Sequence, residues 1–401
     1  MGVDPALASG AESRFDGGWY GVARGGSQKP KIEIALKARS KRIQFTSEFQ
    51  PKEQIWTAKR GRPSIPGLVL YAMADGGFCV WDPARNYWTD TKDGETSSAR
   101  VPGYVFTPGQ VWDGLKSADG KTLCNGLIAD WSGWIRERGE SFKLLNTVLA
   151  SLSPPEGQTL QTGGLKRISL DDVRDIPSIR MADGVETPVL YASAGVRRIL
   201  ALAYMLVWAW QEHRIAADLR GEQQSDRIVF LIDEIEAHLH PKWQRRIVQA
   251  LRHVVEKLSP QARTQLIAAT HSPLIMASIE PQFHEKTDRW FDLDLVDGKP
   301  QLRRMAFVKH GDAEGWLTSE AFDQKSSRAP EYEALMAEAS WLVDERNPDV
   351  DASQIQEMSQ RLINALDPKD AFLMRWRYIA QKKGWVTGAE GASRSAEGEP
   401  Q

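Results

Sequence analysis

The sequence predicts an α/β fold in which helices cover both faces of a parallel core sheet, with an antiparallel β region upstream. Residues 227–232, RIVFLI, form a continuous apolar run, which is typical of a parallel strand buried on both faces. A second apolar run, residues 265–269, ends directly before Thr270 and His271. An amphipathic helix is predicted between the two runs, so the segment has the order of a βαβ unit.

The upstream elements follow from shorter patterns. Residues 31–45 alternate well enough for a strand, and residues 67–82 read as a hairpin with its turn at residues 75–77, Asp-Gly-Gly. From residue 111 to residue 152 the apolar spacing becomes helical. A stretch with proline and glycine, residues 153–164, then interrupts the pattern.

The helices of the second half are predicted in the same way. Residues 195–213 are apolar nearly all round, as expected of a helix buried between layers. The amphipathic helix after residue 240 carries one apolar stripe, which consists of Trp243, Ile247, Ala250, Leu251, Val254 and Leu258. Three helical segments, near residues 330–345, 353–366 and 369–383, form a C-terminal helical extension before a polar tail.

These patterns predict five segments. They are an irregular, basic N-terminal segment with a strand (1–60), a β-hairpin and helical lobe (61–190), a core segment that contains both apolar runs (191–310), the helical extension (311–385) and a disordered tail (386–401).

Composition predicts a globular cytoplasmic protein with no membrane partner. The 401 residues are 41% hydrophobic and 26% charged, and the formal net charge of −2 gives no global attraction to nucleic acid. Cys79 and Cys124 are the only cysteines and form no CxxC pair, so neither a disulfide framework nor a cysteine zinc site is expected. The longest apolar run, residues 199–210, is about half the length of a membrane helix. Residues 1–15 lack the features of a signal peptide.

An acidic pair at the carboxyl end of an apolar strand carries the predicted chemistry. Asp233 and Glu234 follow the first run, and His271 follows the second. A magnesium–triphosphate complex needs a hard oxygen ligand, and the attacking water needs a group that orients or deprotonates it. Adjacent carboxylates point to different sides of a strand and can divide these two tasks. A histidine at the end of the neighbouring strand could contact the γ-phosphate.

Three stretches resemble ABC-type ATPases of the chromosome-maintenance and recombination-repair branch. Residues 228–241, IVFLIDEIEAHLHP, are similar to their Walker B motif and D-loop, and residues 266–273, LIAATHSP, resemble their histidine switch. Residues 191–198, YASAGVRR, are similar to the signature loop that opens a helix. The resemblance is greatest to prokaryotic AAA-like ATPases of overcoming-lysogenisation-defect, Septu and retron defence systems. It extends to residues 315–323, GWLTSEAFD, which are similar to tails of defence-associated members.

The resemblance implies a P-loop NTPase fold of the ABC/SMC head type that uses ATP and Mg²⁺. Asp233 would hold Mg²⁺ through its water shell, and Glu234 would be the general base. His271 would contact the γ-phosphate. Ser193 and Gly195 would cap the phosphate of the nucleotide held by an opposite protomer. The predicted assembly is therefore a homodimer or a head-to-head heterodimer, with an effector subunit as a further partner.

The same resemblance assigns residues 236–240 to a D-loop between the two heads, and His238 of that loop to the nucleotide-binding residues. The signature departs from its commonest form, because Ala192, Ala194 and Val196 replace Leu, Gly and Gln.

The phosphate-binding motif GxxxxGK[ST] is absent from these 401 residues. Residues 114–122, GLKSADGKT, have five residues between the glycines and follow no apolar strand, so Asp119-Gly120 is interpreted as a turn. Residues 21–27 have the glycine spacing and no lysine. The chain either starts late, at an internal methionine, or lends its signature loop to a subunit that carries the motif. The first explanation is favoured because Glu234 and His271 would have no use in a degenerate site.

Two other features allow different chemistry. Asp233, Glu234, His238, His240 and His271 could form a metal cluster of a hydrolase, although a D-loop explains the histidines equally well. Asp292-Leu293-Asp294 resembles the DxD of a Toprim nuclease, and its alternation also fits an ordinary strand.

Residues 29–62 hold ten basic side chains against three glutamates. A solvated sheet face explains this excess, and contact with nucleic acid is the alternative.

Three functions are therefore weighed. The favoured one is an ATPase that dimerises around ATP as the motor or sensor of a bacterial defence or DNA-maintenance system. The alternatives are a non-catalytic regulatory subunit and a metal-dependent nuclease.

Overall fold

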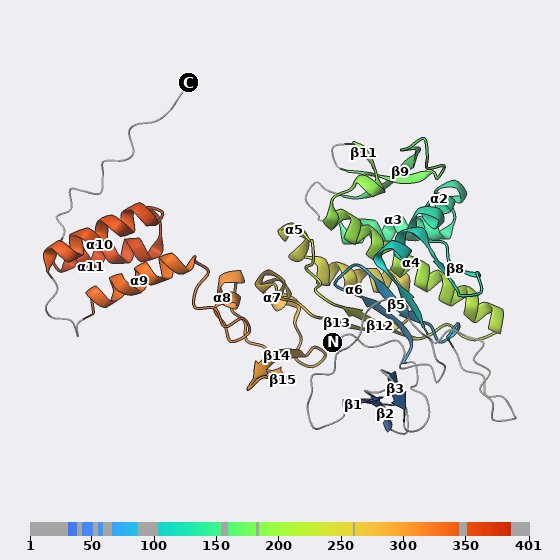
Figure 1. Cartoon of the computed structure of the whole chain (residues 1–401), viewed down its shortest axis with the longest axis horizontal. Coiled ribbons are helices and arrows are strands. Elements are labelled where there is room, and N and C mark those ends of the chain that lie inside the picture. Colours follow the sequence, from blue (N-terminus) through green and yellow to red (C-terminus); the bar gives the residue numbers. More distant parts are fainter. Residues whose placement is uncertain are drawn as a thin grey trace. The chain divides into compact units, whose positions relative to one another are not determined.

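The computed structural model describes residues 31–37, 42–50, 55–58, 66–86, 103–153, 159–181, 184–259, 261–344 and 351–385. The chain divides into two compact units, Met1–Ala313 and Glu314–Gln401. Each unit is described by itself (Figure 1).

A mixed five-stranded sheet organises the first unit, with strand order β13-β12-β4-β5-β6. Its strands are β4 (Leu68–Ala72), β5 (Phe78–Trp81), β6 (Tyr104–Phe106), β12 (Arg227–Ile232) and β13 (Arg263–Ala268). β12 runs parallel to both β4 and β13, whereas β5 and β6 are antiparallel to their neighbours. The predicted α/β fold class is therefore confirmed, together with the hairpin at residues 67–82 and the antiparallel region upstream.

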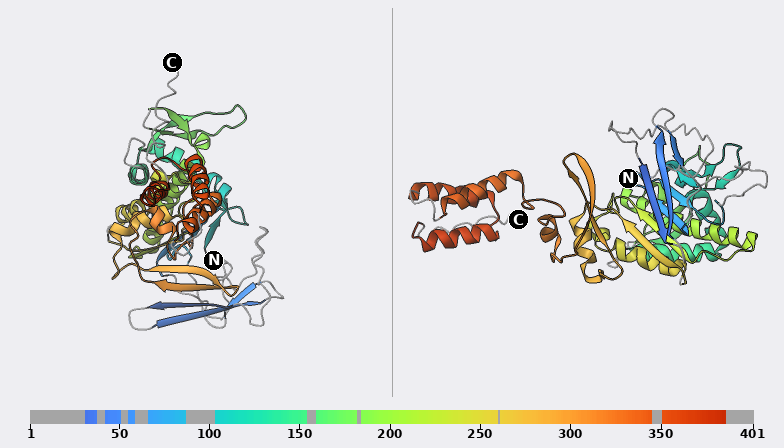
Figure 2. Two further views of the ribbon diagram at one scale, coloured as in Figure 1. Left: turned by 90° about the vertical axis from the view of Figure 1, so that its left-hand side faces the viewer. Right: turned by 90° about the horizontal axis from the view of Figure 1, so that it is seen from below.

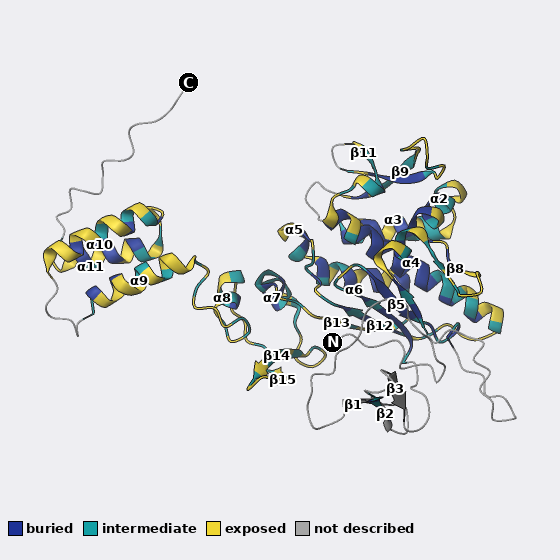
Figure 3. Ribbon diagram, in the orientation of Figure 1, coloured by how far each residue is buried: buried dark blue, intermediate teal, exposed yellow. Residues whose placement is uncertain are grey.

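Helix α4 (Ala194–Arg220) is the central helix of this unit. It is buried on nearly all sides between Ile199 and Trp210, which explains the absence of a polar stripe in that part of the sequence (Figure 3). Ser193 caps its first turn, and Gly221 ends it in a left-handed conformation with φ 64°. The helix is longer than the predicted segment 195–213.

The helical lobe packs against α4. It consists of α1 (Pro108–Asp113), α2 (Leu127–Glu137) and α3 (Glu140–Leu152), and α3 contacts both α4 and α6 (Ile247–Leu258). The short strands β7 (Leu115–Lys116) and β8 (Thr122–Cys124) interrupt the region in which the helical spacing was noted. A small sheet of β9 (Gln161–Lys166), β10 (Ile176–Arg180) and β11 (Glu186–Pro188) follows, and the 3₁₀ turn η2 (Val189–Tyr191) leads to α4.

The predicted apolar stripe after residue 240 is divided between two helices. α5 (Pro241–Gln244) buries Trp243, and α6 buries Ile247, Leu251, Val254 and Leu258. The change of direction at Arg245 and Arg246 brings Trp243 to α3, where its Nε1 donates a hydrogen bond of 3.0 Å to the Leu152 carbonyl. α7 (Pro273–Ile279) and η3 (Glu280–Gln282) complete this part of the chain.

The prediction that both core strands are buried on both faces is wrong. Residues of β12 alternate, with Ile228, Phe230 and Ile232 buried and the residues between them partly exposed. β13 is exposed along most of its length, and Ile267 keeps 48% of its surface. The reason is its position, because β13 is the edge strand of the described sheet and pairs with β12 on one side alone.

Two further sheets were predicted incompletely. The expected strand at residues 31–45 is a hairpin of β1 (Lys31–Lys37) and β2 (Arg42–Gln50), and β3 (Ile55–Ala58) pairs with β2. β14 (Trp290–Val296) and β15 (Lys299–Met305) form a two-stranded ribbon. The Asp-Leu-Asp motif, residues 292–294, lies on β14, so the interpretation of this motif as part of an ordinary strand is confirmed.

The second unit holds α8 (Ala313–Leu317, which begins at the boundary), α9 (Pro330–Leu342), α10 (Ala352–Ala365) and α11 (Ala371–Lys382). The last three helices match the predicted segments and pack around their own apolar core, which includes Leu342, Ile355, Leu362 and Trp376 (Figure 2).

No helix of the described residues has both the length and the apolarity that a membrane span requires.

Candidate functional site

The predicted acidic pair lies where β12 leaves the sheet. The Asp233 N–H donates a hydrogen bond of 2.9 Å to the Ala72 carbonyl of β4, so the backbone of Asp233 is still fixed by the sheet. Glu234 then turns the chain with a left-handed φ of 44°, an uncommon conformation for a non-glycine residue. Asp233 is half-buried and Glu234 is exposed. The two carboxylates therefore differ in surroundings, as a division of tasks requires.

Tyr71 lies beside Asp233 on the neighbouring strand β4. Burial, followed by the negative charge of Asp233, raises the pKa of Tyr71 to about 12. Tyr71 therefore stays protonated at neutral pH beside Asp233. Sequence reasoning placed Tyr71 in the hairpin without assigning it to the site, because its partner is far away in the chain.

The carboxyl ends of β12 and β13 meet at one edge of the sheet. The strands are parallel and Ile232 is opposite Ala268, so Asp233 and His271 both follow at this edge. Backbone hydrogen bonds extend the pairing, from Ala269 N–H to the Ile232 carbonyl at 2.9 Å and from Ile235 N–H to the Ala269 carbonyl at 3.1 Å. The structure thus brings the acidic pair and the histidine to the same edge.

Glu236 connects the loops that follow the two strands. Its carboxylate accepts a hydrogen bond of 2.6 Å from the Thr270 hydroxyl and one of 2.5 Å from the His271 N–H. The charge-assisted hydrogen bond from its N–H fixes the backbone of His271, and the His271 side chain stays exposed. Glu236 had been assigned to the D-loop alone, and its contact with Thr270 and His271 was not predicted.

Ser193 and Gly195 lie at the start of α4. Ser193 is exposed, and its hydroxyl oxygen accepts a hydrogen bond of 3.4 Å from the Val196 N–H. Gly195 is buried against the loop that follows Glu234, where an added Cβ would lie 2.5 Å from the His238 carbonyl oxygen. His238 itself is exposed and has a left-handed φ of 62°. The predicted signature and D-loop residues are therefore neighbours within one chain.

Mg²⁺ fits the donor chemistry of Asp233. A half-buried carboxylate supplies hard oxygen, and its partial exposure leaves room for the water ligands that Mg²⁺ retains. A bound Mg²⁺ would neutralise phosphate charge. In the described part of the chain, no three His, Cys, Asp or Glu side chains are placed as a metal-binding group, so the histidines near Asp233 do not assemble into the metal cluster of a hydrolase.

The other sequence candidates have structural roles. Asp292 and Asp294 both face Arg303, at 2.9 Å and 3.5 Å, so the Asp-Leu-Asp motif is held by an ion pair across the β14–β15 ribbon. Asp119-Gly120 is the tip of the β7–β8 hairpin, as the interpretation as a turn predicted. Residues 21–27 and most side chains of the basic stretch 29–62 lie outside the described residues.

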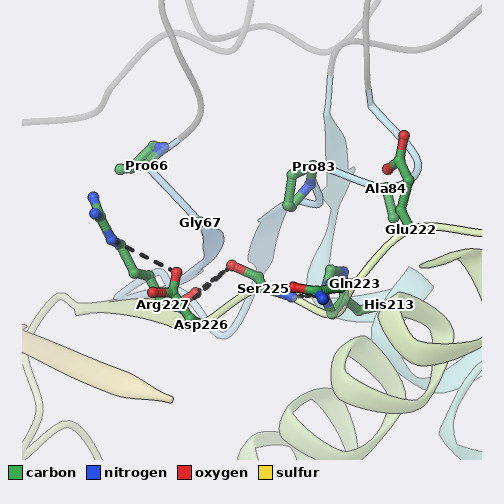
Figure 4. A pocket seen from close by; sticks show the side chains of 10 residues that line it. All are labelled: Pro66, Gly67, Pro83, Ala84, His213, Glu222, Gln223, Ser225, Asp226 and Arg227. Carbon is green, nitrogen blue, oxygen red and sulfur yellow. Dashed lines mark hydrogen bonds and ion pairs between the residues drawn. The ribbon is translucent and has the colours of Figure 1, made fainter. Parts of the chain in front are cut away.

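A pocket lies at the opposite end of the strands, with a volume of about 310 Å³ (Figure 4). Gly67 and Arg227 line it at the amino ends of β4 and β12. His213 Nε2 accepts a hydrogen bond of 2.8 Å from the Ser225 N–H, so its Nδ1 donates to Asp82 at 2.7 Å. Both ring nitrogens are thus used to join α4, β5 and the loop before β12, and His213 is a structural residue.

Comparison with known proteins gives the family context of this geometry. Residues 158–277 match the family model described as "AAA domain, putative AbiEii toxin, Type IV TA system". This range covers the start of α4, the acidic pair and His271. Over these residues the chain is therefore similar to that family.

Two individual proteins are also similar to part of the chain. The chain is 28% identical over 163 residues to the Septu protein PtuA of Bacillus thuringiensis, covering 39% of this chain and 37% of that protein. It is 27% identical over 160 residues to the Retron Ec83 probable ATPase of Escherichia coli, covering 39% of this chain and 26% of that protein. The chain is therefore similar to these two proteins over part of its length, and it spans well under half the length of either.

Solved structures also match. The SMC head domain from Thermotoga maritima is 13% identical, with a TM-score of 0.32, and the match covers 69% of this chain and 74% of that one. A second match, from a study of ATP-driven dimerisation of SMC ATPases, is 18% identical with a TM-score of 0.29 and covers 43% of this chain and 88% of that one.

Proposed function

We propose that this chain supplies the metal-binding and water-activating side of an ATP-hydrolysing site, within a defence-associated ATPase whose heads meet around ATP. The observation that supports this proposal is the meeting of Asp233, Glu234 and His271 at one edge of the sheet. The tie from Glu236 to Thr270 and His271 holds the two loops together.

The reaction assigned to the site is attack of water on the γ-phosphate of ATP. Asp233, beside Tyr71, would hold Mg²⁺ through water. Glu234 follows Asp233 on an exposed turn, where its carboxylate can reach a water molecule and accept its proton. His271 contacts the γ-phosphate. The donors that hold the β- and γ-phosphates belong to a phosphate-binding loop, and no such loop follows a strand in the described residues.

Two heads facing each other would complete the site. The N–H groups at the start of α4 carry the positive end of a 27-residue helix, which favours an anion. Ser193 is exposed at this end, so a phosphate on another protomer can approach it. His238 and the rest of the loop after Glu234 pack against Gly195 and would lie at the same boundary between heads.

Hydrolysis by the protein purified from its native host tests this proposal, because subunits that supply a phosphate-binding loop then accompany the tagged chain. We expect Mg²⁺-dependent ATP hydrolysis that falls by about 10²-fold or more in Glu234→Gln, since the amide cannot accept the proton. Glu256→Gln on the exposed side of α6 is the matched control and should hydrolyse ATP at the wild-type rate. Equal rates in wild type and Glu234→Gln would disprove the role of Glu234. A preparation without any Mg²⁺-dependent hydrolysis would argue against the ATPase.

A further inference from the structure

Arg198 is a half-buried residue beside the candidate site, with buried terminal nitrogens, and the role assignments above do not use it. It lies on α4, in the second turn after the cap at Ser193. Both terminal nitrogens, Nη1 and Nη2, are buried and have no hydrogen-bond partner among the described residues. Its neighbour Arg197 is different, because that side chain is exposed and its guanidinium lies over the Trp112 ring, 5.0 Å from the centroid.

The surroundings of Arg198 are acidic without pairing with it. Burial lowers the pKa of Arg198, and the negative charges of Asp75, Asp233 and Glu234 oppose that shift. The Asp75 carboxylate already accepts a hydrogen bond of 2.8 Å from the Gly77 N–H. The β4–β5 turn lies close by, since a Cβ on Gly76 would be 3.7 Å from Nη1. The Arg198 guanidinium therefore experiences the charges of the candidate-site carboxylates, and its Nη1 and Nη2 atoms are hydrogen-bonded to none of them.

A buried guanidinium without acceptors is costly, because it has lost its water and gained no replacement. Buried polar groups in native proteins are satisfied in the great majority of cases, and the exceptions call for an explanation such as a functional role. An apolar side chain of similar length would pack at this position without that cost. The arrangement thus points to an acceptor that arrives with the substrate.

We propose that Arg198 binds a phosphate oxygen of the nucleotide at the candidate site. This inference rests on the proposed function and adds a phosphate-binding residue to the same site. A metal–phosphate complex carries both signs of charge, so its cation suits the carboxylates and its anionic oxygens suit the guanidinium. The planar fork of arginine matches two phosphate oxygens at once.

Binding requires a local movement. Both nitrogens are buried in the described state, so either the Arg198 side chain rotates outward or the turn at residues 75–77 is displaced. Gly76, at φ 95°, forms the tip of that turn and carries no side chain that would oppose such a displacement.

Phosphate affinity of the full 401-residue chain tests the proposal. The probe is inorganic phosphate with Mg²⁺, and binding is measured as the rise in unfolding temperature against sodium chloride at equal ionic strength. We expect phosphate to stabilise wild type and Arg197→Met alike. In Arg198→Met, binding should weaken about tenfold, the loss of one charge-assisted hydrogen-bonding group. Arg198→Lys keeps the charge without the fork and should fall between them. If the methionine variant does not fold, the lysine variant takes its place in the comparison.

The unfolding temperature without phosphate is a second readout. A purely structural Arg198 predicts that Arg198→Met lowers this temperature and leaves phosphate affinity unchanged, and this result would overturn the proposal. An unliganded temperature equal to or above that of wild type, with weakened phosphate binding, supports it. A wild-type chain that gains nothing from phosphate beyond the salt control also overturns it. Phosphate binding that depends on Arg198 in a protein without ATPase activity would retain this inference and reject the ATPase.

Discussion

At the scale of single residues, the two thiols illustrate how burial controls reactivity. Cys79 is opposite Tyr71 in the β4–β5 pair, and Cys124 lies 3.1 Å from the Tyr204 hydroxyl. Burial raises the pKa of Cys79 to about 12 and that of Cys124 to about 11. Because the thiolate is the reactive form, both groups should be inert in the folded protein at neutral pH.

A thiol reagent measures this prediction. Ellman's reagent at pH 8 should react slowly with the native chain and should titrate both cysteines after unfolding in guanidinium chloride. The sign follows from the raised pKa values. Ionisation favours the unfolded state, so stability should fall as the pH rises above the unfolded thiol pKa of about 8.5. Rapid reaction of either thiol in the native chain would contradict its burial.

The residue scale also shows what the sequence could predict of the site. Asp233, Glu234 and His271 were predictable because each follows an apolar run, and parallel neighbours place their carboxyl ends together. The sequence did not predict which groups surround Tyr71, Glu236 and Arg198 at the site. Each depends on a partner or neighbour distant in the sequence, and no local pattern distinguishes a tyrosine in a strand or a second arginine on a helix from an ordinary surface residue.

At the scale of elements, Gly195 determines how closely α4 approaches the loop after Glu234. A Cβ at this position would lie 2.5 Å from the His238 carbonyl oxygen, which is backbone and cannot rotate away. Gly195→Ala should therefore displace the start of α4 or the loop, and should cost about 1–3 kcal/mol of unfolding free energy.

Gly133 offers the matched control. It lies inside α2, and an added Cβ there would meet nothing within 4 Å. Gly133→Ala should stabilise the protein by about 0.5–1 kcal/mol, because alanine loses less conformational freedom in a helix. Chemical unfolding of both variants checks the pair. If Gly195→Ala is as stabilising as Gly133→Ala, the close approach of α4 to this loop is incorrect.

The helices and strands were predicted well where the burial of each residue shows directly in the spacing of apolar residues. The hairpin β4–β5 and the helices α9, α10 and α11 follow from their periodicity, and α4 from its lack of a polar stripe. β13 was mispredicted because an apolar run shows what a strand can bury and not whether a neighbour covers it. Residues 266–269 of β13 and its extension are apolar, yet the described sheet ends there.

At the scale of the whole molecule, the proposed function requires two heads that close over ATP. Ser193 is the residue that separates this proposal from a simpler one, in which the serine only caps its own helix. The cap is present, since the Ser193 hydroxyl accepts from the Val196 N–H at 3.4 Å. The side chain is nevertheless exposed, and the helix behind it presents its positive end outward. Both properties are needed for a second head to bring a phosphate to this position.

Substitution at Ser193 distinguishes the two roles in the protein from its native host, with Glu234→Gln added so that ATP persists. Ser193→Ala removes the cap, at a cost of about 1 kcal/mol, and adds no bulk. Ser193→Arg removes the same cap and places a long side chain where the opposing nucleotide would lie.

We expect ATP to convert the Glu234→Gln protein to a species of twice the mass in light scattering. The alanine variant should still form this species, and the arginine variant should remain at the original mass. If the cap is the only role of Ser193, the two variants will behave alike, because each loses the same hydrogen bond. A doubled mass that survives Ser193→Arg, or no ATP-dependent doubling in Glu234→Gln, would mean that the heads do not meet through the start of α4.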